Sequence, residues 1–161
     1  IKLILSWDPD ARIILHGVSM GAATVLMASG ETLPENVKAV IADCGYTSEW
    51  DEFIWEAEMI HIPWFPVLNA ASALSKLRDG YDFKQASALE QVKKSDIPSL
   101  FIHGTADELV PYKMLGELFS AAACEKESLT VEGAGHALSS SVEPEMYWST
   151  VERFVEKHIG S

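Results

Sequence analysis

The segment 12–23 constrains the fold most, because a short apolar run there meets a glycine-rich turn. Residues 13–15 are aliphatic, the sequence Gly-Val-Ser-Met-Gly follows, and small helix-compatible residues come next. The pattern predicts a strand, a very tight turn and a helix, with Ser19 at the apex and with Gly17 and Gly21 leaving room for backbone. Free N–H groups at the helix start would favour negative charge beside the hydroxyl. The alternative is a turn that contains serine by chance, because glycine and serine are common in turns.

Further apolar runs follow this segment and alternate with helix-forming stretches. Near-continuous apolar strands separated by helices indicate a parallel sheet that is covered on both faces. We therefore expect an α/β fold, with a mostly parallel sheet and flanking helices. A length of 161 residues indicates one domain over 1–161. The predicted strands are 13–15, 37–42, 97–104 and 128–132. The predicted helices are 20–29, 87–94, 111–122 and about 143–159.

Segment 48–83 breaks this alternation and is unusually rich in aromatic residues. A capping pair at its start and apolar residues at helical spacing predict a helical insertion. We expect the insertion to lie over an apolar substrate, with Trp50, Phe53 and Trp64 as candidate substrate-binding residues. The alternative is that these rings form the small core of the insertion itself.

The charge balance excludes several classes of partner. The chain has 12 Lys and Arg against 24 Asp and Glu, a net charge of −12. Binding to nucleic acid or to an anionic membrane surface depends on clustered Lys and Arg, so neither is expected. No apolar run approaches the length of a membrane span. Cys44 and Cys124 lack metal-site spacing and are interpreted as reduced thiols, which favours a cytoplasmic location; no metal site is expected.

Three side chains could form a nucleophilic site at one edge of the predicted sheet. Serine needs a base within hydrogen-bond reach, and that base must be oriented by a third group. Ser19, Asp107 and His136 each follow a different predicted strand, and the loops after parallel strands open on one edge. We expect His136 to accept the Ser19 proton and Asp107 to fix the imidazole tautomer. Asp43 also follows a strand and is the alternative acid.

The other histidines are assigned to structural or surface positions. His16 precedes the tight turn and His103 ends a strand, so we expect both to support turn geometry by hydrogen bonding. We expect His61, in the insertion, and His158, on the last helix, to lie on the surface.

Three motifs together resemble the α/β-hydrolase superfamily. They are the elbow at 17–21, the stretch His-Gly-Thr-Ala-Asp-Glu-Leu-Val-Pro at 103–111 and Gly-Ala-Gly-His at 133–136. Within the superfamily the chain resembles the serine-aminopeptidase-like and monoglyceride-lipase-like branch of bacterial hydrolases. The resemblance implies a Ser-His-Asp triad, an oxyanion donor from the Met20 backbone N–H and a cap domain over 48–83.

A complete α/β-hydrolase has more strands before the elbow strand, so the resemblance implies that this chain is the C-terminal portion of a hydrolase. The loop that supplies the second oxyanion N–H would belong to the preceding portion. Residues 13–15 would also form an exposed apolar sheet edge, which proteins avoid. We expect a missing N-terminal half, or a second copy in a homodimer, to cover this edge.

The expected activity is hydrolysis of a small-molecule carboxylic ester through an acyl-enzyme, with no cofactor. Thioesterase, peptidase and acyltransferase reactions use the same triad and stay open as alternatives. A different class of alternative is a non-catalytic or weakly active fragment that binds a ligand or dimerises.

Overall fold

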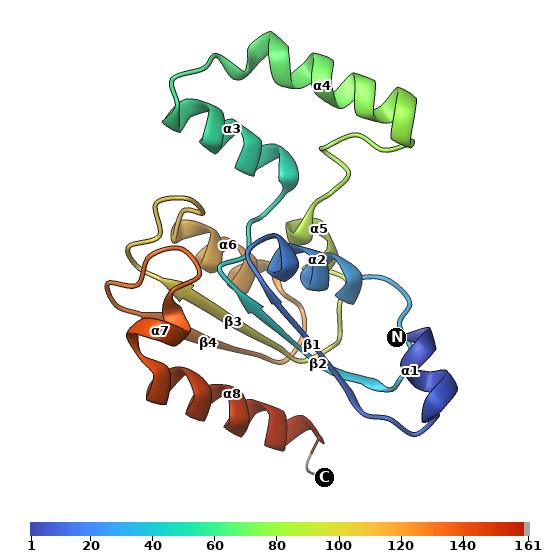
Figure 1. Ribbon diagram of the computed structural model, residues 1–161. Coiled ribbons are helices and arrows are strands. Elements are labelled where there is room, and N and C mark those ends of the chain that lie inside the picture. The colour runs from blue at the N-terminus through green and yellow to red at the C-terminus, as the bar shows by residue number, and fades with distance from the viewer. Residues whose placement is uncertain (160–161) are drawn as a thin grey trace.

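The strands form one sheet in which neighbours in sequence are neighbours in space. In the computed structural model, which describes residues 1–159, the strand order is β1-β2-β3-β4 and all three pairings are parallel (Figure 1). This arrangement confirms the predicted α/β fold. The elements are α1 (Lys2–Trp7), β1 (Ile13–Val18), α2 (Met20–Ser29), β2 (Val37–Asp43), α3 (Glu49–Met59), α4 (Trp64–Asp79), α5 (Ala88–Val92), β3 (Ser99–Gly104), α6 (Lys113–Ala121), β4 (Lys126–Val131), α7 (Ser139–Val142) and α8 (Pro144–Ile159).

Each face of the sheet carries its own apolar cluster, because successive side chains of a strand point to opposite faces. Val40 and Ala42 of β2 pack on the face covered by α2, α5 and α6, with Leu26 and Leu118 among the helical partners. On the other face, Ile41 and its neighbours pack against α8 through Tyr147, Val151 and Phe154. The two clusters make a three-layer structure that holds the carboxyl ends of the strands in fixed positions.

The two helix caps that were predicted from the sequence, at Ser48 and Ser87, are formed in the structure. The Ser48 hydroxyl accepts from the Asp51 N–H at 3.0 Å, and the Ser87 hydroxyl accepts from the Glu90 N–H at 3.2 Å. Gly80 ends α4 in the left-handed conformation, with φ of 87°. The short helix α7 was not predicted, because four residues rich in serine carry no periodic pattern.

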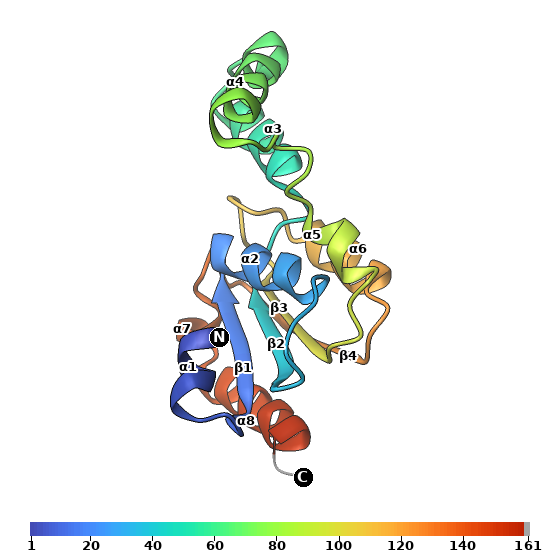
Figure 2. The ribbon, with the colours of Figure 1, turned by 90° about the vertical axis from the view of Figure 1, so that its right-hand side faces the viewer.

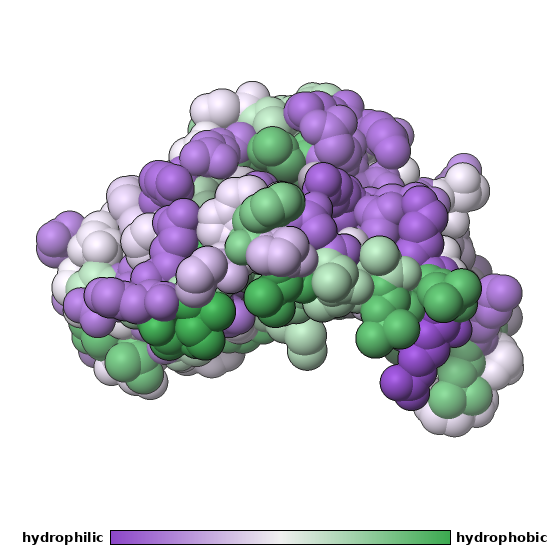
Figure 3. Space-filling model, turned by 90° about the horizontal axis from the view of Figure 1, so that it is seen from above, coloured by the Kyte–Doolittle hydropathy of each residue, from purple (hydrophilic) through white to green (hydrophobic). Residues whose placement is uncertain are grey.

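Helices α3 and α4 form a pair that stands beyond the carboxyl ends of the strands, apart from the layers (Figures 1 and 2). The two ends of the inserted segment meet where Ser48 and Ser87 form an antiparallel bridge. Trp55 of α3 donates through Nε1 to the Glu108 carbonyl oxygen at 3.2 Å, which ties the pair to the loop after β3. Seen from above, the surface shows apolar patches set among hydrophilic residues (Figure 3).

Strand β1 lies at the edge of the sheet, as expected for the first strand of this chain. Helix α1 lies beside the start of β1 (Figures 1 and 2). Large apolar side chains are exposed on α1 and at the end of β1. Leu3 is 63% exposed, Trp7 75% and Val18 42%. Among residues 1–159, the structure contains no helix with the length and apolar character needed to cross a membrane.

Candidate active site

The elbow between β1 and α2 holds Ser19 in a conformation that is uncommon for a residue with a side chain. Its φ is 56° and its ψ is −121°, and its N–H donates to the Asp43 carbonyl oxygen at 2.8 Å. Left-handed φ in a residue other than glycine costs free energy and persists only where surrounding structure enforces it. Here the sheet on one side and the helix on the other enforce it, and the hydroxyl is lifted off the strand.

The two glycines of the elbow have different roles. A Cβ atom on Gly17 would lie 2.1 Å from the Gly21 carbonyl oxygen, so only glycine allows β1 and α2 to approach this closely. A Cβ atom on Gly21 would meet nothing within 4 Å. The expectation that both glycines leave room for backbone therefore holds for Gly17 and is wrong for Gly21.

His136 reaches the elbow from the loop after β4. Gly104, at the end of β3, permits this loop to pass close by, because a Cβ atom there would lie 2.2 Å from the Ala134 carbonyl oxygen. The Gly133 N–H donates to the Thr105 hydroxyl at 2.9 Å, which joins the two loops again. The imidazole is thus carried by one loop and supported by the loop of the neighbouring strand.

Asp107 lies in the loop after β3 with its carboxylate fully buried. One oxygen, Oδ1, accepts from the N–H groups of Leu109 and Val110, at 3.0 and 2.9 Å. The other oxygen, Oδ2, lies 2.9 Å from His136 Nδ1. The two backbone donors fix the carboxylate so that its second oxygen is directed at the imidazole.

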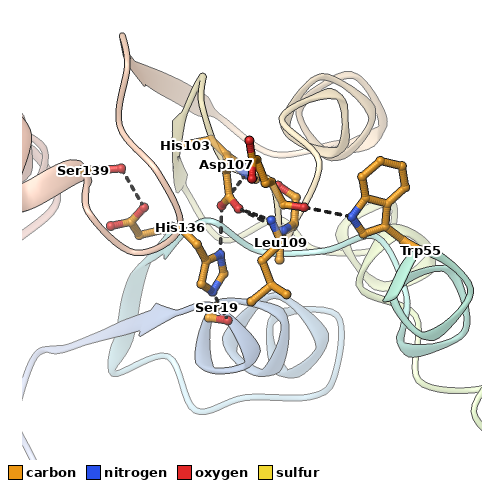
Figure 4. A network of polar contacts seen from close by, with 10 residues as sticks. Ser19, Trp55, His103, Asp107, Leu109, His136 and Ser139 are labelled. Atoms are coloured by element: carbon orange, nitrogen blue, oxygen red, sulfur yellow. Dashed lines mark hydrogen bonds and ion pairs between the residues drawn. The ribbon is translucent and has the colours of Figure 1, made fainter. Parts of the chain in front are cut away.

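A continuous polar chain links the three predicted residues (Figure 4). His136 Nε2 lies 2.8 Å from Ser19 Oγ, and Nδ1 of the same ring is held by Asp107. With Nδ1–H donated to the carboxylate, Nε2 is free to accept the serine proton. The structure brings together side chains that are separated by up to 117 positions in sequence.

Asp43, the alternative acid, has different hydrogen-bond partners, and within residues 1–159 the imidazole of His136 is bound by Asp107 instead. The Ser139 hydroxyl donates to its Oδ1 at 3.3 Å (Figure 4). Burial raises the pKa of this carboxyl group, and hydrogen bonds from Tyr147 and Ser139 oppose that effect. Asp43 closes the end of β2 and does not bind His136.

The remaining histidines differ in part from their expected positions. His103 is fully buried; its Nε2 donates to the Val110 carbonyl oxygen at 3.0 Å and lies 3.3 Å from Asp107 Oδ2. It therefore supports the loop that carries the acid, and burial lowers its pKa. His16 instead contacts the Tyr147 hydroxyl at 3.2 Å, which ties β1 to α8 rather than bracing the elbow. His61 is exposed, whereas His158 is half-buried because its ring packs edge-on against Phe154.

A cavity of about 160 Å³ lies beside Ser19, between the elbow and α3. Phe53 lines it, as predicted for a substrate-binding residue. Trp50 and Trp64 are not among its lining residues; they pack against each other edge-on, with ring centroids 6.3 Å apart. Sequence reasoning did not single out the acidic residues of this cavity, although their spacing of three and four positions on one helix was a usable signal. Its lining residues are Ser19, Met20, Tyr46, Glu49, Glu52, Phe53, Glu56 and Leu109.

Met20, the predicted oxyanion donor, is the first residue of α2. Its N–H belongs to the first turn of the helix, where backbone donors have no acceptor within the helix. The same residue lines the cavity beside Ser19. The backbone is therefore placed where negative charge on a bound carbonyl would be favoured.

The geometry also tests whether these residues suit a metal ion. Ligand atoms of Cys44, Asp107 and His136 lie within 4.8 Å of one another. Burial raises the pKa of the Cys44 thiol to about 12, so at neutral pH it carries its proton and is a poor metal ligand. Both other side chains are already engaged in the chain that ends at Ser19.

Comparison with known proteins places this arrangement in a family. The model of the prolyl oligopeptidase family matches residues 7–161. The chain belongs to the prolyl oligopeptidase family. This membership confirms the resemblance to α/β-hydrolases and assigns the chain to a family of hydrolases.

Curated relatives are longer than this chain. Protein YqkD of Bacillus subtilis, which is uncharacterized, is 29% identical over 143 residues, covering 88% of this chain and 47% of the relative. The uncharacterized protein Rv2307c of Mycobacterium tuberculosis is 28% identical over 148 residues, covering 92% of this chain and 46% of the relative. The chain therefore spans about half the length of the curated relatives it matches.

Solved structures share the fold. An esterase from Pyrococcus furiosus superposes with a TM-score of 0.73 at 21% identity, covering 98% of this chain and 58% of the esterase. A puromycin-hydrolyzing peptidase from Mycobacterium tuberculosis superposes with a TM-score of 0.74 at 20% identity, covering 98% of this chain and 24% of the peptidase. At these identities the likeness establishes the α/β-hydrolase fold alone.

Proposed function

We propose that this chain carries the catalytic triad of a serine hydrolase that cleaves carboxylic esters through an acyl-enzyme. The observation that supports this most directly is the polar chain from Asp107 Oδ2 through the His136 ring to Ser19 Oγ, with contacts of 2.9 and 2.8 Å. Both contacts fall in the range that proton transfer requires. Membership of a hydrolase family agrees with this assignment.

The proposed reaction has two stages that use the same base. In the first, Ser19 Oγ attacks the ester carbonyl carbon while His136 Nε2 takes the hydroxyl proton. The tetrahedral intermediate collapses, His136 returns the proton to the leaving alcohol, and an acyl-serine is left. In the second stage, water attacks the acyl-serine with His136 again as the base, and the acid is released. Asp107 keeps the imidazole in the required tautomer throughout.

Charge that develops on the carbonyl oxygen would be stabilised by the Met20 N–H at the start of α2. An aimed backbone donor of this kind contributes about 3 kcal/mol to transition-state stabilisation. We also propose that the α3–α4 pair acts as the predicted cap, because α3 lines the cavity beside the nucleophile and is tied to the loop of Asp107 through Trp55.

Amide hydrolysis is the second candidate, and family membership is the observation that favours it. The same serine, base and acid would serve, with His136 protonating a leaving amine. Amides are less reactive than esters, so activated esters are the more sensitive first probe for both candidates.

The test is covalent labelling combined with ester turnover. A fluorophosphonate probe should label the wild-type chain, and 4-nitrophenyl butyrate should be hydrolysed. Ser19→Ala should abolish labelling and reduce turnover to the uncatalysed rate, whereas Ser141→Ala, which alters an exposed serine, should change neither. If Ser19 stays unlabelled and Ser19→Ala hydrolyses the ester like the wild type, the chain is a non-catalytic module and the proposal fails.

A further inference from the structure

Helix α3 presents a row of carboxylates to the cavity beside Ser19. Glu49, Glu52 and Glu56 are spaced by three and four positions, which places them on one face of the helix. All three line the cavity that Ser19 also lines. The other residues that line the cavity are neutral, so within residues 1–159 its walls carry no basic side chain.

Glu52 is held there under conditions that are unfavourable for a carboxylate. The residue is 6% exposed, and its Oε2 atom is buried without a hydrogen-bond partner. Burial, followed by repulsion from Glu56 and Asp107, raises its pKa to about 7. An unpaired buried acceptor costs folding free energy, and nothing within residues 1–159 forms an ion pair with any of the three glutamates.

We propose that the substrate of the Ser19 site carries a primary ammonium group, which Glu52 binds with the support of Glu49 and Glu56. The inference rests on the proposed function, since it assigns a substrate class to the same site. An ammonium group supplies N–H donors for the carboxylate oxygens of the glutamates that line the cavity, and a positive charge that balances the acidic row. A neutral polar group would supply only the donors, and an anion would be repelled.

The position of the glutamates relative to Ser19 also sets how far the cation lies from the reacting carbonyl of the substrate. The cavity volume of about 160 Å³ is suited to a short chain with a terminal ammonium. Phe53, on the same helix, provides an apolar wall for the methylene groups between the reacting carbonyl and the cation. The site would therefore select small cationic acyl groups or cationic leaving groups over neutral ones of the same shape.

A matched pair of esters tests the proposal with the full chain. At pH 8, 4-nitrophenyl 6-aminohexanoate carries an ammonium group where 4-nitrophenyl heptanoate carries a methyl group. We expect the wild type to favour the cationic ester by at least about tenfold in kcat/KM. Glu52→Gln, and separately Glu56→Gln, should reduce this preference at least about fivefold. Glu58→Gln, on an exposed position of the same helix outside this cavity, should leave the preference unchanged.

An inhibition experiment tests the other possibility, that the cation belongs to the alcohol portion of the ester. Hexylammonium should inhibit hydrolysis of the neutral ester more strongly than hexanol does in the wild type and lose this advantage in Glu52→Gln. Ser19-dependent hydrolysis with no preference for either cation overturns the inference and leaves the proposed function standing. If neither ester is hydrolysed through Ser19, the proposed function fails, and hexylammonium binding to the wild type and to Glu52→Gln, followed by NMR, then decides the cation site by itself.

Discussion

Asp43 and Asp107 are two buried carboxylates at the ends of adjacent strands, and their hydrogen bonds give them different roles. Asp107 is fixed by two backbone N–H groups and directs its second oxygen at His136. Asp43 accepts from Ser139 and contributes to the packing at the end of β2. Residue type, burial and position after a strand are alike in the two, so their hydrogen-bond partners are what distinguish them.

Exchanging each carboxylate for an amide tests this difference. Asp107→Asn should reduce kcat by about 10⁴-fold, because an amide cannot stabilise the imidazolium or enforce the tautomer. Asp43→Asn should reduce it by less than about tenfold. Steady-state hydrolysis of 4-nitrophenyl butyrate by both variants gives the comparison, with circular dichroism as a control for folding. A larger loss in Asp43→Asn would assign the acid to β2 instead.

The raised pKa of Glu52 makes a prediction about stability. A carboxyl whose folded pKa is about 7 and whose ordinary value is 4.5 binds more protons in the folded than in the unfolded chain. Its contribution therefore favours folding at low pH and is lost as the pH rises from about 4.5 to about 7. Relative to Glu52→Gln, the wild type should lose about 2–3 kcal/mol of stability between pH 5 and pH 8. Urea unfolding of both proteins at the two pH values measures this; equal changes would contradict it.

At the scale of elements, the strand–turn–helix unit of β1 and α2 depends on one close backbone contact. Gly17→Ala should destabilise the chain by at least about 3 kcal/mol, because the new Cβ atom would displace the carbonyl of Gly21 and with it the start of α2. Gly21→Ala should be neutral or stabilise by up to about 1 kcal/mol, because the space is free and alanine favours helix. Thermal unfolding of the two variants checks the contrast. Equal losses would show that the two glycines are equivalent.

The α3–α4 pair shows at the same scale how aromatic residues divide between two tasks. Trp50 packs on Trp64, and Phe53 packs on Phe83 with ring centroids 4.9 Å apart. Phe53 alone of the three predicted substrate-binding residues also lines the cavity beside Ser19. Of the three predicted residues, Trp50 and Trp64 therefore hold the two helices together, and Phe53 lines the cavity beside Ser19.

For the molecule as a whole, the free edge of β1 and the apolar side chains near it predict self-association. Strand edges with apolar surroundings pair with other chains unless they are covered. We expect the 161-residue chain to form a homodimer, and the double substitution of Leu3 and Trp7 by lysine to weaken it. Leu77→Lys, at an exposed position of α4, should leave it unchanged.

Size-exclusion chromatography with light scattering, over a range of protein concentrations, measures this association. A wild-type chain that stays monomeric throughout would contradict the expectation. Equal weakening by Leu77→Lys would place the contact at α4 rather than at β1.

Local sequence was enough to predict those parts of the fold that depend on neighbouring residues. The apolar runs predicted the strands, Ser48 and Ser87 predicted helix starts, and the tight turn predicted the place of Ser19. Parallel strands with loops at one edge also predicted that Ser19, Asp107 and His136 would meet. These inferences hold because capping, periodicity and strand polarity act over a few residues.

Other features were decided only by tertiary structure, because they depend on which groups face one another across the fold. Sequence favoured Asp107 but left Asp43 open as the alternative acid. It could not show that His16 contacts Tyr147 or that the space beside Gly21 is free. It also could not show that Glu52 lies buried in the same cavity wall as Ser19 with an unpartnered carboxylate oxygen, since a glutamate on a helix usually reaches solvent. The sequence by itself determined the strand–turn–helix unit and the identities of the candidate reacting groups. The position of α3 across the cavity from the elbow decided the environment of these groups, because burial and charge are properties of the assembled chain.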